Sequence, residues 1–224
     1  MLNDWRLFFR EYLRNFHHTG AVSPSSRFLA AALARHVPGE GSLDERAPRR
    51  VLEVGPGTGA VTGQIVASLG PEDRFDLVEW NERFVDCLRR RFETEPAWKA
   101  VDDRVRVIHG PVQDLPQEGA YRAIVSGLPL NNFAVADVEQ ILAAYCGLLA
   151  PGGTLSFFEY VAVRPARALV SGRAERQRLQ GIGRALDALL SQYEFRRDCV
   201  WPNLPPAWVH HVRWPGRDSS SVGP

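Results

Sequence analysis

The sequence predicts a single α/β domain with a mostly parallel sheet and helices on both of its faces. Apolar segments of strand length alternate with segments of helical period over residues 50–161, and strands separated by such helices pair in parallel. The last two apolar segments, 195–201 and 207–214, are separated only by PNLPP, so they predict an antiparallel hairpin at one edge. A length of 224 residues fits one sizeable domain with additions.

The N-terminal residues 1–37 predict a helical extension ahead of the sheet. Apolar residues recur there at three- and four-residue steps, the period of one helical face: Leu2, Trp5, Phe8, Phe9, Tyr12, Leu13 and Phe16. Arginines at 6, 10 and 14 line another face. A turn-rich break then supplies Ser25 or Ser26 as the cap of a second helix over residues 28–37. The polar stretch 38–49 predicts a linker into the main domain, residues 49–214.

Within the main domain, strands and helices follow in order. The expected strands are 50–54, 75–79, 105–109, 121–126 and 154–161, the last of them introduced by LLAPGG. The expected helices are 59–69, closed by Gly70 and Pro71, then one from its cap Asn81 to about residue 92, then 134–149, and an arginine-rich helix over 172–193. The tail, residues 215–224, is expected to be disordered.

Composition excludes several classes of protein. The chain is 45% hydrophobic and 24% charged, which is ordinary for a globular protein, and its formal net charge of +1 provides no global attraction to nucleic acid. The three cysteines form no CxxC pair, so they indicate neither a disulfide framework nor a metal site, and they fit a reducing cytoplasm. No apolar run approaches the roughly 20 residues of a membrane span. The first residues are too charged for a signal peptide, so we expect a cytoplasmic protein.

The most informative stretch is VLEVGPGTGAVT, residues 51–62. Gly55, Gly57 and Gly59 leave the backbone bare between a strand and a helix, so its N–H groups can approach a nucleotide-like ligand. The spacing differs from the G-x-G-x-x-G pattern of dinucleotide sites. Glu53, two residues before the first glycine, would oppose a pyrophosphate but would neutralise the ammonium group of S-adenosylmethionine.

A second acidic signal stands at the end of the next strand. Glu79, followed by Trp80, lies where an acid binds both hydroxyls of an adenosine ribose. With these motifs, residues 49–214 resemble the class I S-adenosylmethionine-dependent methyltransferases. The resemblance implies a Rossmann-like fold of seven strands whose glycine turn holds the methionine part of the cofactor, with Glu79 and Trp80 at the ribose.

The resemblance also implies an acid after the third strand, near the adenine amino group. In HGPVQDLP, Pro111 occupies the place where the family often has that acid. We therefore expect Asp114, or backbone near Val112, to take this role.

The loop after the fourth strand, SGLPLNNF, is expected to face the reacting methyl group, because open parallel sheets bind ligands at the carboxyl ends of their strands. From this loop we assign Ser126 to the cofactor, Leu128 and Pro129 to the catalytic position, and Asn131 and Phe133 to the substrate. Enzymes that methylate the amines of nucleic-acid bases carry a similar tetrapeptide, which begins with Asn or Asp and ends in an aromatic residue. Ser126 and Leu130 stand in those two places here, which argues against a nucleic-acid base as the methyl acceptor.

Three segments, GAVSPSSRFLAAALA, SGLPLNN and NLPPAWVHHVR, resemble the bacterial phospholipid N-methyltransferases, and the likeness covers most of the chain. It implies methyl transfer from S-adenosylmethionine to phosphatidylethanolamine and its partly methylated forms, toward phosphatidylcholine. The residues agree, because a helix with an aromatic face and an arginine face can lie on an anionic membrane surface. A helix docked on the core is the alternative. We assign Tyr12, Ser25 and Arg164 to the substrate. The basic stretch 164–184 is a solvated face, a second lipid-facing surface or a site for the substrate phosphate.

The implied chemistry is direct displacement, in which a neutral amine attacks the sulfonium methyl group in line. Tyr160, at the end of the fifth strand, is the candidate for accepting the amine proton or holding the amine, against an ordinary strand-end tyrosine. Aromatic faces could come from Tyr12, Phe133 and Trp201. His109 closes a strand that reads as buried and is expected to be structural, while His210 and His211 alternate faces, so at most one points into a site.

Two other functions remain open from the sequence. One is an RNA adenine N-methyltransferase, and the other is a cofactor-binding protein without activity that docks on a membrane or a partner. The leading prediction is a peripheral enzyme on the inner face of the cell membrane, with a lipid substrate, no nucleic acid and no metal. The sequence makes no prediction of the oligomeric state.

Overall fold

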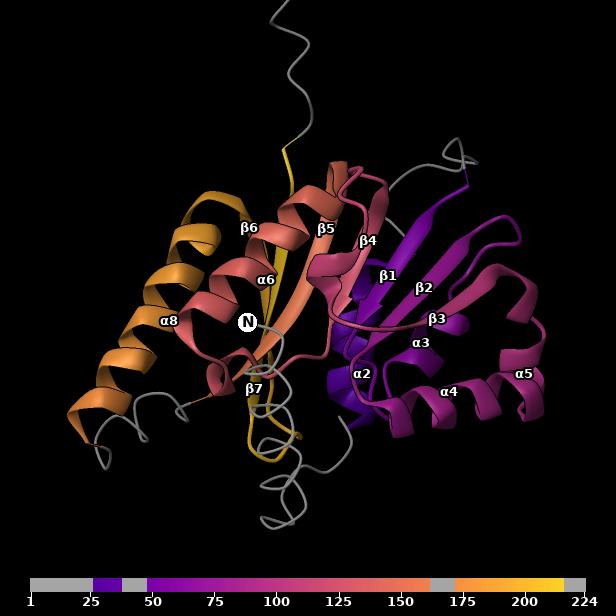
Figure 1. The fold of residues 1–224 in the computed structure, drawn as a ribbon, viewed down its shortest axis with the longest axis horizontal. Coiled ribbons are helices and arrows are strands. Elements are labelled where there is room, and N and C mark those ends of the chain that lie inside the picture. Colours follow the sequence, from indigo (N-terminus) through magenta and orange to yellow (C-terminus); the bar gives the residue numbers. More distant parts are fainter. Residues whose placement is uncertain (1–25, 38–47, 162–171, 216–224) are drawn as a thin grey trace, which may run out of the picture.

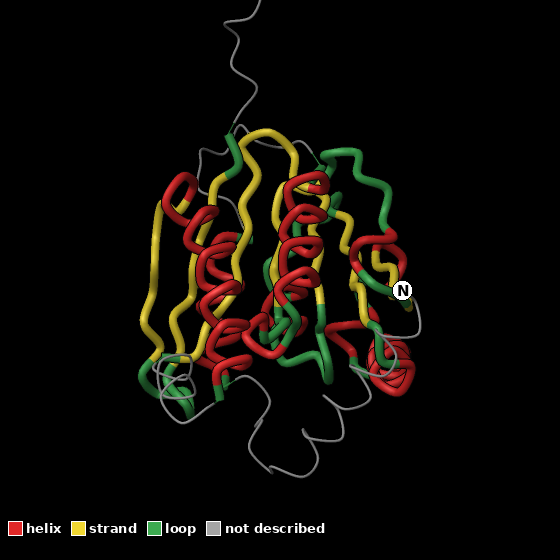
Figure 2. The backbone as a smooth tube through the Cα atoms, turned by 60° about the vertical axis from the view of Figure 1, so that its left-hand side comes forward, coloured by secondary structure: helices red, strands yellow, loops and turns green. Residues whose placement is uncertain are grey.

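The computed structural model describes residues 26–37, 48–161 and 172–215, whose elements form a sheet between two layers of helices (Figure 1). One apolar cluster packs one face of the sheet against the first four α-helices of the described chain, and the other packs the opposite face against the last two. Figure 2 shows these last two, α6 and α8, side by side along the sheet.

The sheet has seven strands in the order β3-β2-β1-β4-β5-β7-β6. The strands are β1 (Arg50–Val54), β2 (Arg74–Glu79), β3 (Val105–His109), β4 (Tyr121–Ser126), β5 (Leu149–Tyr160), β6 (Glu194–Val200) and β7 (Ala207–Arg213). Strands β1 to β5 pair in parallel, and β7 is antiparallel to both β5 and β6. The predicted mostly parallel sheet with an antiparallel C-terminal hairpin is therefore confirmed.

Helices cover both faces of the sheet. The α-helices are α2 (Arg27–Leu33), α3 (Thr62–Val66), α4 (Glu82–Thr94), α5 (Pro96–Lys99), α6 (Val135–Leu148) and α8 (Arg173–Tyr193). Short 3-10 turns are η1 (Ala34–His36), η2 (Asp102–Arg104), η3 (Val112–Asp114) and η4 (Leu130–Asn132). Two expected caps are present, since Ser26 Oγ accepts from the Leu29 amide at 3.3 Å and Asn81 Oδ1 from the Arg83 amide at 3.0 Å.

Three expectations about these elements were wrong. The helix expected over 59–69 spans only Thr62–Val66, because Gly59 has a φ of +89° and belongs to the turn. Strand β5 starts at Leu149 rather than at residue 154, because Leu149 pairs with Tyr121 ahead of a register shift. His109 ends an edge strand and is exposed, and its Nε2 donates to the Trp80 carbonyl at 2.9 Å.

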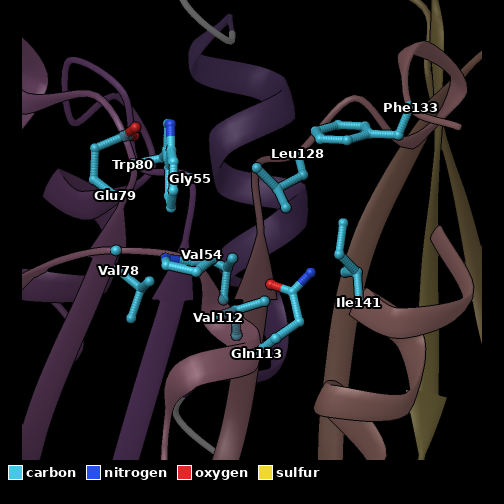
Figure 3. Close-up of a pocket in the computed structure, with 12 residues that line it drawn as sticks. Val54, Gly55, Val78, Glu79, Trp80, Val112, Gln113, Leu128, Phe133 and Ile141 are labelled. Atoms are coloured by element: carbon cyan, nitrogen blue, oxygen red, sulfur yellow. The ribbon is translucent and has the colours of Figure 1, made fainter. Parts of the chain in front are cut away.

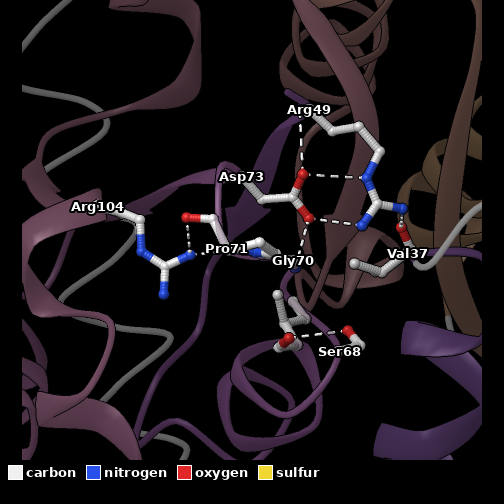
Figure 4. Close-up of polar contacts among 8 residues, drawn as sticks. Val37, Arg49, Ser68, Gly70, Pro71, Asp73 and Arg104 are labelled. Carbon is white, nitrogen blue, oxygen red and sulfur yellow. Dashed lines mark hydrogen bonds and ion pairs between the residues drawn. The ribbon is translucent and has the colours of Figure 1, made fainter. Parts of the chain in front are cut away.

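A salt-bridged cluster fixes the amino ends of the strands, opposite the edge where ligands bind (Figure 4). Arg49 donates through Nε and Nη2 to the two Asp73 carboxylate oxygens at 3.2 and 2.5 Å, and through Nη1 to the Val37 carbonyl at 3.1 Å. The Gly70 amide donates to Asp73 at 2.8 Å, and Arg104 donates to the Gly70 carbonyl. This cluster ties the end of η1 to the starts of β1, β2 and β3.

Candidate active site

A mostly apolar pocket opens at the carboxyl ends of β1 and β2 and holds about 370 Å³ of space, counting its open mouth (Figure 3). Twelve residues line it: Val54, Gly55, Val78, Glu79, Trp80, Gly110, Pro111, Val112, Gln113, Leu128, Phe133 and Ile141. An apolar cleft with a few polar groups at one end is the usual form of a site for a small organic ligand.

Glu53 lies on β1 beneath the glycine turn and is fully buried. One carboxylate oxygen accepts from the Thr62 hydroxyl at 2.7 Å, while the other, Oε1, has no hydrogen-bond partner among the residues that the structure describes. Burial raises the pKa of this carboxyl to about 8, against the lowering effect of the Thr62 hydrogen bond, and the nearby charge of Glu79 raises it further. A buried acid with a spare oxygen is suited to a cationic ligand group.

The glycine turn brings bare backbone to the mouth of the pocket. Gly55, Gly57 and Gly59 have φ values of +69°, +57° and +89°, which side chains rarely adopt. A Cβ atom on Gly55 would also lie 2.5 Å from Leu128 Cδ2, so the turn and the loop after β4 are in close contact. Gly55 alone of the three lines the pocket, while a Cβ atom on Gly59 would meet Trp98 and Arg91 and one on Gly57 would meet nothing within 4 Å. The cofactor roles of the three glycines stay predictions.

Glu79 ends β2 and is buried at the pocket beside Trp80. Its Oε2 accepts from the Gly57 amide at 3.0 Å and its Oε1 from the Asn81 amide at 2.8 Å. Burial raises the pKa of this carboxyl although those amides lower it. These hydrogen bonds hold one oxygen against the glycine turn and the other against the start of α4, at the pocket where Glu79 is predicted to bind ribose hydroxyls.

The far end of the pocket, where the adenine ring is expected, distinguishes the two candidates proposed from the sequence. Val112 is buried and lines the pocket, whereas Asp114 is exposed and is not among the lining residues. Gln113 lines the pocket too and was missed, because a residue in a short 3-10 turn has no periodicity to mark it. Its amide can both donate and accept, as an adenine edge requires.

Ser126, the last residue of β4, is fully buried and its hydroxyl is used within the protein. It accepts from the Tyr145 hydroxyl at 2.8 Å and from the Leu128 amide at 3.3 Å. Tyr145 of α6 was not predicted as a site residue. Ser126 therefore shapes the start of the loop, and Leu128 lines the pocket with Pro129 next to it, before η4.

Asn131 and Phe133 follow in the same loop and are both buried. Phe133 lines the pocket, and Asn131 Oδ1 has no hydrogen-bond partner within the described ranges. Arg178 of α8 donates to the main-chain carbonyls of both residues, at 3.1 Å for Asn131, and is held by Glu175 at 2.7 Å. Arg178 was predicted only as one member of the basic stretch 164–184, and its role in holding this loop was missed because its partners are distant in the chain.

Tyr160 ends β5 at the same edge of the sheet but is not among the residues that line the pocket. Its ring packs at 5.2 Å from the Phe158 ring on the face covered by α2, and burial raises the pKa of its hydroxyl. On the other face, His210 stacks on Phe157 and its Nε2 lies 3.5 Å from Glu159.

His210 and His211 lie on opposite faces of β7, as predicted, since His211 contacts the His36 ring at 4.4 Å. Three predicted substrate residues, Tyr12, Ser25 and Arg164, lie outside the described residues, as do the aromatic N-terminal segment and the tail beyond residue 215.

The residues present fit S-adenosylmethionine. Glu53 does not line the pocket, but its buried carboxyl has an oxygen without a partner among the described residues that could accept from the ammonium group. Glu79 lines the pocket and could accept from the ribose hydroxyls, and the apolar slot can take a flat ring. Residues 51–153 match a family model described as a methyltransferase domain. The geranyl diphosphate C-methyltransferase of Streptomyces coelicolor A3(2), solved with Mg²⁺, geranyl diphosphate and S-adenosyl-L-homocysteine, has a TM-score of 0.56, with 16% identity and coverage of 82% of this chain and 77% of that one.

The chain is a class I S-adenosylmethionine-dependent methyltransferase. An ornithine lipid N-methyltransferase of Singulisphaera acidiphila is 29% identical to this methyltransferase over 157 residues, which are 69% of this chain and 77% of that protein. A ribosomal RNA small subunit methyltransferase A of Parasynechococcus marenigrum is 37% identical over 86 residues, but these are 37% of this chain and 26% of that protein. In the described part of the chain, no helix is long and apolar enough to cross a membrane.

Proposed function

We propose that this methyltransferase acts on the amine of an aminolipid at the membrane surface, with phosphatidylethanolamine and its partly methylated forms as acceptors, toward phosphatidylcholine. One observation carries the proposal. The likeness to the ornithine lipid N-methyltransferase runs over 157 residues, beyond the 51–153 that match the methyltransferase domain, so it includes regions outside the cofactor-binding part. The likeness to the ribosomal RNA enzyme covers 86 residues, a length that a shared cofactor-binding part alone would explain.

The cofactor supplies a methyl group on a positively charged sulfur. Glu53 would hold its ammonium group and Glu79 its ribose, while Trp80 and Val112 would pack against the flat ring. Leu128 and Phe133 provide apolar walls that exclude water between the glycine turn and the loop after β4 (Figure 3). These residues position the reactants, which is most of what a direct displacement requires.

The acceptor amine must present its lone pair, so its hydrogens need acceptors. The buried Asn131 Oδ1 is such an acceptor, since the described residues provide it with no donor. Tyr160 could hold the amine through its hydroxyl oxygen. Burial raises the pKa of that hydroxyl, which disfavours a phenolate base, and Tyr160 is not among the residues that line the pocket.

The membrane part of the proposal rests on the N-terminal segment, which lies outside the described residues. Its aromatic face and its arginine face suit an anionic bilayer, which would make the enzyme a peripheral protein on the inner face of the cell membrane. Arg164 and Tyr12 remain proposed substrate contacts.

Transfer from methyl-labelled cofactor tests the acceptor. We expect label to enter phosphatidylethanolamine in vesicles, more with anionic lipid and less with added salt, because the Debye length shortens as salt rises. Vesicles with ornithine lipid form a second arm, and naked ribosomal RNA a third. Label in RNA and none in lipid would replace the proposal, and no label in any arm from a protein that still binds the cofactor would refute it.

A further inference from the structure

The turn between β6 and β7 presents two large apolar side chains to solvent. Trp201 is 68% exposed and Leu204 is 86% exposed, the highest values among the large apolar residues that the structure describes. Phe28, near the start of α2, is 45% exposed. Two such side chains exposed on one short turn form an apolar patch, and exposed apolar patches often mark interaction sites.

Hydrogen bonds hold this turn in place. The side chain of Asn203 is buried, its Oδ1 accepts from the Ser26 amide at 3.3 Å, and its Nδ2 donates to the Pro205 carbonyl at 2.8 Å. The Val161 amide donates to the Pro206 carbonyl at 2.7 Å. The turn is thereby tied to the cap of α2 and to the end of β5, with its polar residue inside and its apolar residues outside.

The turn lies at the edge of the sheet where the pocket opens. Strand β6 runs parallel to β1, β2, β4 and β5, so its carboxyl end is at their carboxyl edge, and Ala207 after the turn pairs with Tyr160 (Figure 1). A surface that bound Trp201 and Leu204 would therefore face the same edge as the active site.

The charges around the turn favour a bilayer as the partner. Residues 199–212 contain no Asp, Glu, Lys or Arg. Exposed Arg197 lies on β6 ahead of Asp198 and the turn, and exposed Arg27 starts α2, whose cap residue Ser26 bonds the turn. Arg27 lies over the Phe28 ring at 4.8 Å, and Arg197 lies over the Trp208 ring at 5.1 Å. An apolar centre flanked by arginines fits the interface of an anionic membrane, where tryptophan sits among headgroups and arginine pairs with phosphate.

We propose that the β6–β7 turn is a membrane-docking surface that inserts Trp201 and Leu204 among the headgroups of an anionic bilayer. It is separate from the N-terminal segment and holds the pocket toward the lipid. The choice of a bilayer rests on the proposed function, but docking itself needs no methyl transfer and is measured without it.

The test is flotation of the full chain with vesicles of phosphatidylcholine and phosphatidylglycerol. Serine at both positions, Trp201→Ser with Leu204→Ser, should lower the partition coefficient by about tenfold or more, since two apolar side chains lose their burial in lipid. The matched control, Trp201→Phe with Leu204→Ile, should stay within about twofold of the wild type, because its apolar surface is kept. Calorimetry with S-adenosylhomocysteine should give wild-type affinity for both, since neither residue lines the pocket.

Wild-type partitioning of the serine variant would overturn the proposal. If that variant also lost thermal stability, the N-terminal segment would be the partner of the turn, and if it dissociated a dimer, a second copy would be. A wrong lipid acceptor gives a different result, namely normal flotation with no label in lipid, and leaves this inference intact.

Discussion

At the scale of single residues, burial in the folded protein favours the neutral form of Glu53, whereas binding of an ammonium group favours its charged form. Its carboxyl has a pKa of about 8 in the folded chain against an ordinary value of 4.5, mainly because it is fully buried. The folded state therefore keeps a proton that the unfolded state releases between these values. Without cofactor, stability should fall as pH rises from about 5 to about 8.

Glu53→Gln should remove that part of the pH dependence and make the cofactor-free protein more stable at pH 8, by a few kcal/mol at most. Urea unfolding of both proteins across this pH range measures it. The same variant should bind S-adenosylmethionine more weakly, because the ammonium group loses its carboxylate. Equal pH slopes for variant and wild type would mean that Glu53 is not the titrating group.

Glu79→Ala should weaken cofactor binding by about 1 to 3 kcal/mol, the range for leaving hydrogen-bonding groups without a charged acceptor. Glu82→Ala is the matched control, since Glu82 is exposed on the next helix and outside the pocket. Calorimetry measures both. A dissociation constant for Glu79→Ala equal to that of the control would remove Glu79 from the site.

Glu53 and Glu79 could be selected as candidates from the sequence because each stands at or next to the end of a strand, and strand ends can be read from neighbouring residues. Thr62 and Gln113 could not, because the contact of Thr62 with Glu53 and the place of Gln113 at the pocket depend on how α3 and η3 pack in the fold. Asp114, or backbone near Val112, was predicted because the family often has an acid after the third strand, yet the 3-10 turn leaves Asp114 in solvent.

At the scale of elements, α8 holds the loop after β4 through Arg178, which bonds the carbonyls of Asn131 and Phe133. Arg178→Ala should let the loop move and lower kcat by about tenfold or more, with a smaller effect on cofactor affinity, because the lost contacts position the acceptor side. Arg184→Ala, on an exposed part of the same helix, is the control. Turnover equal to that of the control would show that the clamp does not position the acceptor.

Strands were easier to predict than helix limits. β1, β3 and β4 have the predicted bounds, since apolar runs between turn residues mark both ends. The start of α3 could not be predicted from periodicity. Residues 59–61 fit a helical pattern in the sequence, but in the structure they belong to the glycine turn.

At the scale of the whole molecule, alternation of strands and helices was enough to predict a parallel sheet, and the short PNLPP link was enough to predict the hairpin. The position of β7 between β5 and β6 was not specified, because the sequence does not say which strand of a hairpin joins the sheet. The membrane role of the N-terminal segment stays a prediction.

That role has its own test. Phe8→Ser with Phe9→Ser in the full chain should reduce binding to anionic vesicles by about tenfold or more, since apolar burial in the interface is lost. Cofactor affinity should change little. Arg74→Ser, which removes an exposed arginine at the opposite edge of the sheet, is the control. Full partitioning of the phenylalanine variant would refute the anchor.

The most direct test of the central claim is mass spectrometry of lipids from cells that make no methylated aminolipid of their own and express this chain. We predict phosphatidylethanolamine species with added methyl groups in cells with the wild-type chain, and none in cells with Glu53→Gln. An unchanged lipid profile, from cells whose purified protein binds S-adenosylmethionine, would contradict the claim.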